Sequence, residues 1–193
     1  MRPANPVRQG ELLASIESTL AEIEKSDIPE LNAGPRAFHE WIKQPDAIEV
    51  SMGWMKTTIH DELIFTQHLA DCSAIVLCTE YDENTGIYAR RSLMHAVGSN
   101  LSVCDGSEDI LSLIQMASES SGKPRCIIAL GTNVESHHFA TIANQEVQTS
   151  EGRLLKPFKE LQVLCDTVIL ERKNSIAVRS DGTYAVVGSH HHG

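Results

Sequence analysis

The residues best suited to chemistry are Cys72 and His95, which lie at the outer ends of two strand-like segments. Residues 73–80 form a short apolar run, and residues 87–95 form a second run. Between them, residues 82–86 read Asp-Glu-Asn-Thr-Gly, a cluster of turn-forming residues. Two runs of this length around a tight turn predict a β-hairpin.

Folding the chain midway between Cys72 and His95 places these two residues opposite each other. Directly opposed residues on antiparallel strands share a face, with Cβ atoms about 5 Å apart. A thiol and an imidazole in this relation can form a nucleophile–base pair, in which the imidazole removes the thiol proton. Because a slip of one residue would put the two side chains on opposite faces, the prediction depends on the register.

The other cysteines are interpreted as structural, because buried thiols are common in apolar segments. These are Cys78, Cys104, Cys126 and Cys165. Other histidines lie in expected surface segments or near the start of a helix: His39, His60, His68, His137 and His138. A zinc site would need three or four ligands. Cys72 and His95 could supply two of them, with His39, His60 or His68 as a third, although no CxxC or HxxxH spacing supports this reading.

Charge and composition restrict the class of partner. The 193 residues are 41% hydrophobic and carry a net charge of −10. An acidic chain disfavours nucleic-acid backbones and anionic membranes as partners, and no apolar run reaches the roughly 20 residues that span a bilayer. Five cysteines without a disulfide-like spacing, and no signal-like N-terminus, indicate a cytoplasmic protein. An effector exported without a cleaved signal is an open alternative.

The pattern along the chain predicts three parts. Residues 1–44 form a helical N-terminal extension, with amphipathic stretches at Gln9–Lys25 and 36–43. Residues 45–188 alternate between strand-like and helical segments, which predicts an α+β domain with a mixed, largely antiparallel sheet and helices packed in layers. Residues 189–193 include three histidines and are interpreted as a tail or tag remnant.

Within the body, the apolar runs and turn residues predict the individual elements. Strands besides the hairpin are expected at 47–50, 53–58, 62–66, 126–131, 162–170, 175–180 and 183–187. Helices are expected from a start at 105–109, near 136–147 and at 153–161.

Three segments before and around Cys72 form a recognisable pattern: Ile48–Trp54 reads IEVSMGW, Asp61–Thr66 reads DELIFT, and Leu69–Leu77 reads LADCSAIVL. Together these segments resemble the CheD family of bacterial chemoreceptor glutamine deamidases. Members of this family have a strand ending in Met-Gly, then a threonine and a catalytic cysteine, and a catalytic histidine on the next strand. The same arrangement occurs in glutamine-deamidating toxins of the lethal-factor and necrotizing-factor type.

The resemblance implies a Cys-His-Thr site formed by Cys72, His95 and Thr66. Such a site hydrolyses the side-chain amide of a protein glutamine, without a cofactor or metal. Thr66 would orient His95, and backbone N–H groups at Asp71 and Cys72 would stabilise the oxyanion. The implied partner is a target protein with a reactive glutamine, either a chemoreceptor or a host protein.

The motif departs from the family at Ala70-Asp71, where Gly-Ser is usual. If the first position needs a positive φ, alanine would be strained there, and the carboxylate of Asp71 disfavours a thiolate at Cys72. A CheD-like binding module without chemistry is therefore one alternative. The Ala-Asp-Cys segment followed by His95 also resembles metal-dependent, YfiH-type purine nucleoside enzymes, but their His-Ala-Gly-Trp-Arg-like motif reads His-Ala-Val-Gly-Ser at residues 95–99.

Overall fold

The computed structural model describes residues 31–97, 106–135, 140–141 and 143–188. Within these residues the fold is α+β, as predicted, with three helices and eleven strands in mostly antiparallel sheets. Several predicted features lie wholly or partly outside the described residues: the helix at 9–25, residues 136–139 and 142 of the helix near 136–147, and the tail at 189–193. The division of the chain at residues 44 and 45 stays a prediction.

The strands form two main sheets, whereas the sequence predicted one. Sheet A has the order β1 (Ile48–Glu49), β3 (Ile64–Thr66), β10 (Lys173–Val178) and β11 (Tyr184–Gly188). Sheet B has the order β2 (Met55–Thr58), β5 (Ile87–Ala96), β4 (Ser73–Asp82), β6 (Arg125–Leu130) and β9 (Asp166–Leu170). The pairs β1–β3 and β6–β9 are parallel, and the other pairs are antiparallel. A small third sheet pairs β7 (Val147–Gln148) with β8 (Leu154–Leu155).

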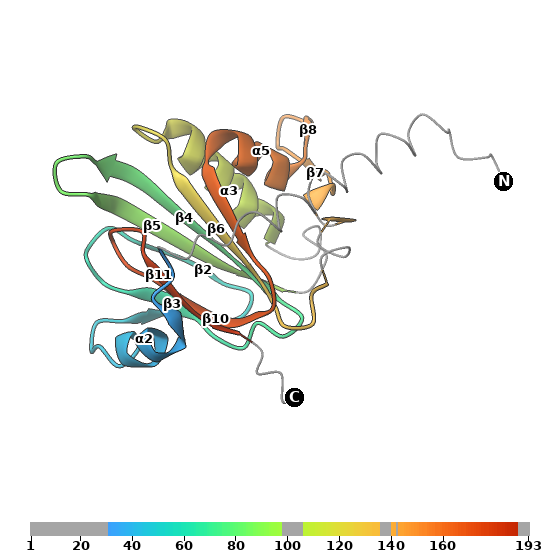
Figure 1. Cartoon of the computed structure of the whole chain (residues 1–193). Helices are drawn as coiled ribbons and strands as arrows, with labels where there is room; N and C mark the ends of the chain where they lie inside the picture. Colours follow the sequence, from blue (N-terminus) through green and yellow to red (C-terminus); the bar gives the residue numbers. More distant parts are fainter. Residues whose placement is uncertain (1–30, 98–105, 136–139, 142, 189–193) are drawn as a thin grey trace.

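The two main sheets pack face to face, with helices on their outer faces (Figure 1). Helix α2 (Gly34–Trp41) covers sheet A, and helices α3 (Gly106–Glu119) and α5 (Pro157–Leu164) cover sheet B. Because both faces of sheet B are covered, its central strands are apolar on both faces. Residues 73–79 of β4 are all buried, which explains why this strand reads as a continuous run in the sequence.

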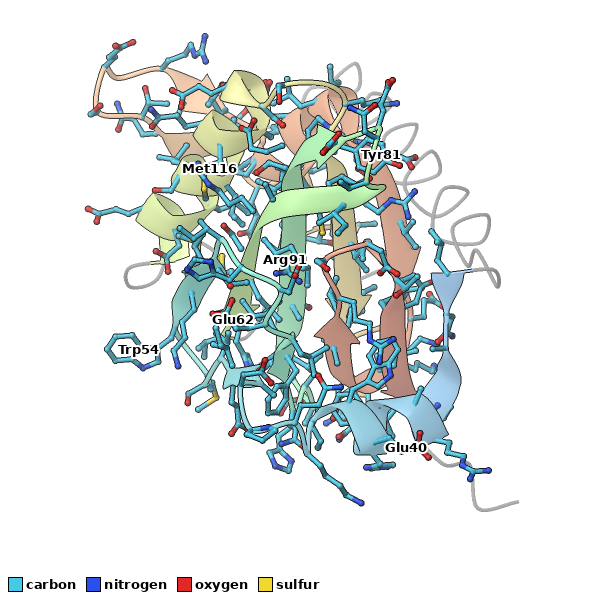
Figure 2. All side chains as sticks on the ribbon, turned by 90° about the vertical axis from the view of Figure 1, so that its left-hand side faces the viewer. Glu40, Trp54, Glu62, Tyr81, Arg91 and Met116 are labelled. Atoms are coloured by element: carbon cyan, nitrogen blue, oxygen red, sulfur yellow. The ribbon has the colours of Figure 1, made fainter. Side chains whose placement is uncertain are left out.

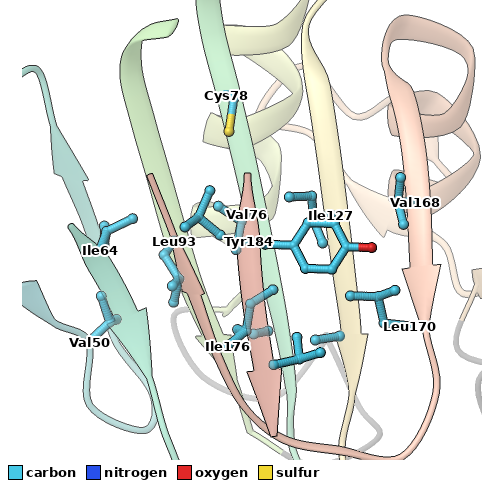
Figure 3. Packing of buried hydrophobic residues seen from close by; sticks show 14 of the residues in the cluster. Val50, Ile64, Val76, Cys78, Leu93, Ile127, Val168, Leu170, Ile176 and Tyr184 are labelled. Carbon is cyan, nitrogen blue, oxygen red and sulfur yellow. The ribbon is translucent and has the colours of Figure 1, made fainter. Parts of the chain in front are cut away.

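The core between the sheets is apolar and contains the candidate site at one end. Figure 3 shows Ile64, Ile176 and Tyr184 of sheet A beside Val76 and Ile127 of sheet B. All five residues are fully buried. Burying an aliphatic side chain of this size stabilises the fold by about 1.5–3 kcal/mol. This core therefore fixes the two sheets against each other and gives the site a rigid setting.

Two predicted boundaries in the C-terminal half are wrong. The helix expected at 153–161 begins at Pro157 and continues to Leu164, and the strand expected from residue 162 begins at Asp166. Proline is favoured in the first turn of a helix, and it disfavours helical backbone at the residue before it. Residues 154–155 instead form β8, and the preceding β7 was not predicted.

Helix α2 also begins earlier than predicted, because Pro35 again occupies the first turn. Its buried residues Phe38 and Trp41 pack against Phe65 of β3 and neighbouring alanines of sheet A. The guanidinium of Arg179 lies 3.9 Å from the ring centre of Trp41, which adds a cation–π contact. None of the described helices is both long and apolar enough to cross a bilayer.

Candidate active site

The predicted hairpin is present, but its register differs from the prediction. Strands β4 and β5 pair antiparallel around the turn 83–86, and His95 lies opposite Ala74 rather than opposite Cys72. The turn sets this register. Gly86 adopts a φ of 70° and donates its N–H to the carbonyl of Asp82 at 2.8 Å, so that Asp82 pairs with Ile87. The midpoint of the hairpin is therefore one residue later in the chain than predicted. As a result, the residue opposite His95 lies two positions further along the chain than predicted.

A displacement of two residues keeps the side chains on the same face of the sheet. Cys72 directly precedes β4, and it packs in the inter-sheet core together with Ala74. Ala74 lies opposite His95, so Cys72 and His95 are diagonal neighbours on one face. Diagonal neighbours in an antiparallel pair lie about 7–8 Å apart, within reach of a long or aromatic side chain. The Cys72 thiol and the His95 imidazole therefore both lie between the two sheets, at the end of the hairpin opposite its turn.

A pair of hydrogen bonds orients the His95 ring. The hydroxyl of Thr66 donates to the carbonyl of Val50 at 2.6 Å, and Thr66 Oγ1 lies 2.7 Å from His95 Nδ1. A hydroxyl has one hydrogen, and here the Val50 carbonyl takes it. The ring must therefore donate its Nδ1–H to Thr66, which leaves the lone pair of a neutral ring on Nε2. This is the tautomer that a general base needs when Nε2 faces the nucleophile.

Burial lowers the pKa of His95 below its ordinary value of 6.5. The Val50 carbonyl acts in the opposite direction, and the nearby His68 lowers the pKa further. The imidazole is consequently neutral at neutral pH. Its Nε2 atom is buried, and within the described residues it has no hydrogen-bond partner, Cys72 included. Hydrogen bonds of a catalytic base are often long without substrate and shorten only in the reacting complex.

The loop before Cys72 is held by the end of strand β6. The N–H groups of Gly131, Thr132 and Asn133 donate to the carbonyls of Cys72, Leu69 and Ala70 at 2.9, 3.0 and 2.9 Å respectively. A Cβ atom added to Gly131 would lie only 1.8 Å from the Leu69 carbonyl and 2.4 Å from the Cys72 carbonyl. Only glycine allows this close approach of two backbone segments. Gly131 therefore positions the loop that carries the thiol.

The two unusual motif residues, Ala70 and Asp71, are accommodated locally. The positive φ in this loop belongs to His68, at 63°, and not to Ala70, so alanine carries no left-handed strain here. The carboxylate of Asp71 accepts a hydrogen bond from the side-chain amide of Asn133 at 3.0 Å. The N–H groups of Asp71 and Cys72 donate to no other residue that the structure describes. They remain candidates for the oxyanion-binding donors.

The site is nearly closed. Cys72 is 6% exposed, His95 is 2% exposed, and Thr66 is fully buried. Of these three residues, Cys72 therefore retains the largest exposed fraction.

The other described cysteines, Cys78, Cys126 and Cys165, lie in the core. Burial raises the pKa of Cys78 and of Cys165 to about 12, and it raises the pKa of Cys126 as well. Such thiols are unreactive at neutral pH. Cys104 and the histidines at 137 and 138 lie outside the described residues.

A metal centre does not form from the residues considered above. Among the residues that the structure describes, no three His, Cys, Asp or Glu side chains come together as metal ligands. His39, His60 and His68 are all exposed, and none of them completes a ligand set with Cys72 and His95.

Neither protein-family models nor curated proteins match this chain. The resemblance to the CheD family therefore depends on the residues around Cys72 themselves.

Sequence reasoning missed three contributors to the site: the Val50 carbonyl, Gly131 and Asn133. A backbone carbonyl leaves no signal in a sequence. Gly131 ends a fully apolar strand and precedes Thr132-Asn133, which could have indicated a close backbone approach.

Proposed function

We propose that this protein is a protein-glutamine deamidase, in which Cys72 is the nucleophile and His95 the general base. One observation carries the proposal. Hydrogen bonds from His95 Nδ1 to Thr66 and from Thr66 to Val50 leave Nε2 as the unprotonated nitrogen, on the sheet face that also bears Cys72. We infer the substrate, a glutamine side chain of a protein, from the resemblance to the CheD family.

The reaction begins with proton transfer from the Cys72 thiol to His95 Nε2. The sulfur attacks the carboxamide carbon of the substrate glutamine, and the carbonyl oxygen becomes an oxyanion. The N–H groups of Asp71 and Cys72 stabilise this oxyanion, and losing one such donor typically slows a reaction about 100- to 1,000-fold. The protonated His95 gives its proton to the leaving nitrogen, and ammonia departs from a thioester.

The second half of the reaction releases glutamate. A water molecule loses a proton to His95 Nε2 and attacks the thioester carbon. The carbon–sulfur bond breaks, and the thiolate of Cys72 takes back the proton from His95. The sum is the conversion of glutamine and water to glutamate and ammonia, and no cofactor enters it.

Thr66 acts on the base and not on the substrate. Its hydroxyl fixes the tautomer and the orientation of His95. The single hydroxyl hydrogen goes to the Val50 carbonyl, so that the oxygen can only accept from His95 Nδ1. In this proposal the target is a protein of the same cell, such as a chemoreceptor, or a host protein reached by export. A cytoplasmic enzyme fits the first case.

The experiment is a deamidation assay on candidate target proteins and on glutamine-containing peptides. Wild-type protein releases ammonia and converts one glutamine to glutamate, detected by peptide mass spectrometry. The variants Cys72→Ser and His95→Gln keep the fold and lose the activity. Equal activity in both variants and the wild type would refute the proposed mechanism.

A binding module without chemistry is the second candidate. The observation in its favour is that His95 Nε2 and the Cys72 sulfur are not hydrogen bonded and are nearly closed off from solvent. For such a module, Cys72→Ser leaves the biological effect of the protein intact, whereas the deamidase loses it.

A further inference from the structure

Three exposed apolar side chains surround the end of the hairpin that carries His95. Met52 is 61% exposed, Trp54 is 66% exposed, and Val97 is 55% exposed. Met52 and Trp54 belong to a tight turn, in which the Trp54 N–H donates to the Ser51 carbonyl at 3.1 Å. Gly53 provides the positive φ of 81° that this turn requires. We call Met52, Trp54 and Val97 the apolar rim.

The apolar rim is tied to the backbone of the catalytic base. The Gly53 N–H donates to the His95 carbonyl at 3.0 Å, and the His95 N–H donates to the Trp54 carbonyl at 2.9 Å. Val97 lies two residues after His95, and its Cγ2 atom is 3.5 Å from the position of a Cβ atom on Gly53. Continuing the β4–β5 register places Val97 opposite Cys72. The rim is therefore held in a fixed position relative to both reacting groups.

Single exposed apolar residues are common on proteins and need no explanation. This group differs because three such residues come from one turn and one strand end, beside the candidate site. The other tryptophan of the chain, Trp41, is buried. Figure 2 shows Trp54 at the edge of the molecule, with its ring projecting away from the strands. Exposed tryptophans at binding surfaces often supply a large share of the affinity.

We infer that the apolar rim binds the polypeptide segment that presents the substrate glutamine, an inference that rests on the proposed function. A glutamine side chain is short, and Cys72 is only 6% exposed. When the carboxamide of the glutamine reaches the sulfur, the backbone of the target must lie close to the exposed edge of Cys72. Its neighbouring side chains then contact Val97 and Trp54. The rim therefore selects targets with an apolar residue beside the glutamine.

Charge narrows the target further. Within the described part of the chain, two exposed carboxylates and one ammonium group lie near the site. Asp71 adjoins Cys72, and the Glu49 carboxylate accepts a hydrogen bond from Gln67, the residue after Thr66, at 3.3 Å. Lys56 Nζ donates to the Glu49 carbonyl at 2.7 Å, so that among these groups carboxylates outnumber ammonium groups by two to one. The whole chain carries a net charge of −10. Complementary charge favours association and suppresses partners of like charge. The preferred segment thus combines a glutamine, an adjacent apolar residue, and lysine or arginine.

The test uses a synthetic peptide with one glutamine flanked by leucine and lysine. Matched peptides carry serine in place of leucine, or glutamate in place of lysine. The protein variant is Trp54→Ala, and Val163→Ala is the control, because Val163 is 80% exposed but lies on α5, in the helical layer that covers sheet B. Kinetics of deamidation and calorimetric binding of each peptide to the Cys72→Ser variant are both measured.

We expect Trp54→Ala to lower kcat/KM for the leucine–lysine peptide about tenfold, mainly through KM. The decrease in kcat/KM is smaller for the serine peptide, because that peptide has no apolar side chain that can contact the apolar rim. The Val163→Ala variant matches the wild type. Turnover by wild type with no difference between Trp54→Ala and Val163→Ala would overturn the inference and leave the proposed function standing. Peptide binding that depends on Trp54 but gives no ammonia release would overturn the proposed function and support peptide binding by the apolar rim. Absence of both binding and turnover would overturn both.

Discussion

Thr66 and His95 come from different sheets, and the 2.7 Å hydrogen bond between Thr66 Oγ1 and His95 Nδ1 joins these sheets at the candidate site. Thr66 lies on β3 of sheet A, and His95 lies on β5 of sheet B. The packing of the two sheets therefore sets the position of the His95 imidazole.

Replacing Thr66 by valine removes the hydroxyl and keeps the side-chain shape. His95 Nδ1 and the Val50 carbonyl then lose their buried partner, which costs about 1–3 kcal/mol in the free energy of unfolding. The ring is also free to adopt the other tautomer, so we expect a loss of activity of about 10- to 100-fold. Thr66→Ser retains the hydroxyl and most of both properties. Denaturant unfolding and the deamidation assay test this, and equal effects of valine and serine would contradict the role of the hydroxyl.

The pH dependence of stability follows from the buried imidazole. The unfolded chain binds a proton at His95 near pH 6.5, whereas the folded chain binds it only at lower pH, because burial lowers the pKa. The free energy of unfolding therefore decreases as the pH falls below about 6.5, by about 1.4 kcal/mol for each unit of pKa difference. Chemical denaturation between about pH 7.5 and about pH 5 measures this dependence, because that range brackets the ordinary histidine pKa.

The matched variants for this measurement are His95→Gln and His39→Gln. His95→Gln removes this contribution and flattens the dependence, while His39→Gln, at an exposed position, keeps the wild-type slope. The same slope in all three proteins would show that His95 is not buried as a neutral ring.

Gly131→Ala tests the contact that holds the loop before Cys72. The added methyl group overlaps the carbonyls of Leu69, Ala70 and Cys72, so the loop must move. We expect a loss of about 1–3 kcal/mol in stability, as is typical for overpacking, together with slower reaction of Cys72. Gly188→Ala is the control, because the nearest atom to its added Cβ is 3.7 Å away and its φ is not positive. An unchanged thiol reactivity in Gly131→Ala would show that this loop does not position Cys72.

Thiol selectivity provides a test on the native wild-type protein. The high pKa of Cys78, Cys126 and Cys165 keeps these buried thiols protonated. Brief treatment with iodoacetamide at neutral pH should therefore modify Cys72 before these three, as read out by peptide mass spectrometry. Earlier modification of any of the three would contradict the structure of the core.

The sequence predicted the α+β class and the hairpin, because apolar runs and turn residues are local signals. Thr66 came from the resemblance to the CheD family, and the catalytic roles of Thr66, Cys72 and His95 stay predictions. The sequence did not predict that the strands divide into two sheets, since the separation depends on long-range pairing. β3, for example, joins β10 instead of its sequence neighbours β2 and β4. The register error of two residues arose from the turn at Gly86, whose conformation determines the midpoint of the hairpin.

Arg91 illustrates a second limit of sequence reasoning. It lies within β5, is fully buried, and donates from Nη2 to the His60 carbonyl. A charged residue normally indicates an exposed position. Only the three-dimensional structure shows that the segment before β3 covers it. The hydrogen bonds of Val50 and Asn133 were hidden for the same reason, since they join segments far apart in the sequence.

The measurement that tests the central claim most directly is the rate of Cys72 alkylation in the wild type and in His95→Gln, over a range of pH. It needs no knowledge of the target protein. If His95 Nε2 removes the thiol proton, the wild type reacts at least about tenfold faster than His95→Gln near neutral pH, and the difference disappears at high pH, where the free thiol ionises by itself. Equal rates in the two proteins at neutral pH would contradict the nucleophile–base pair.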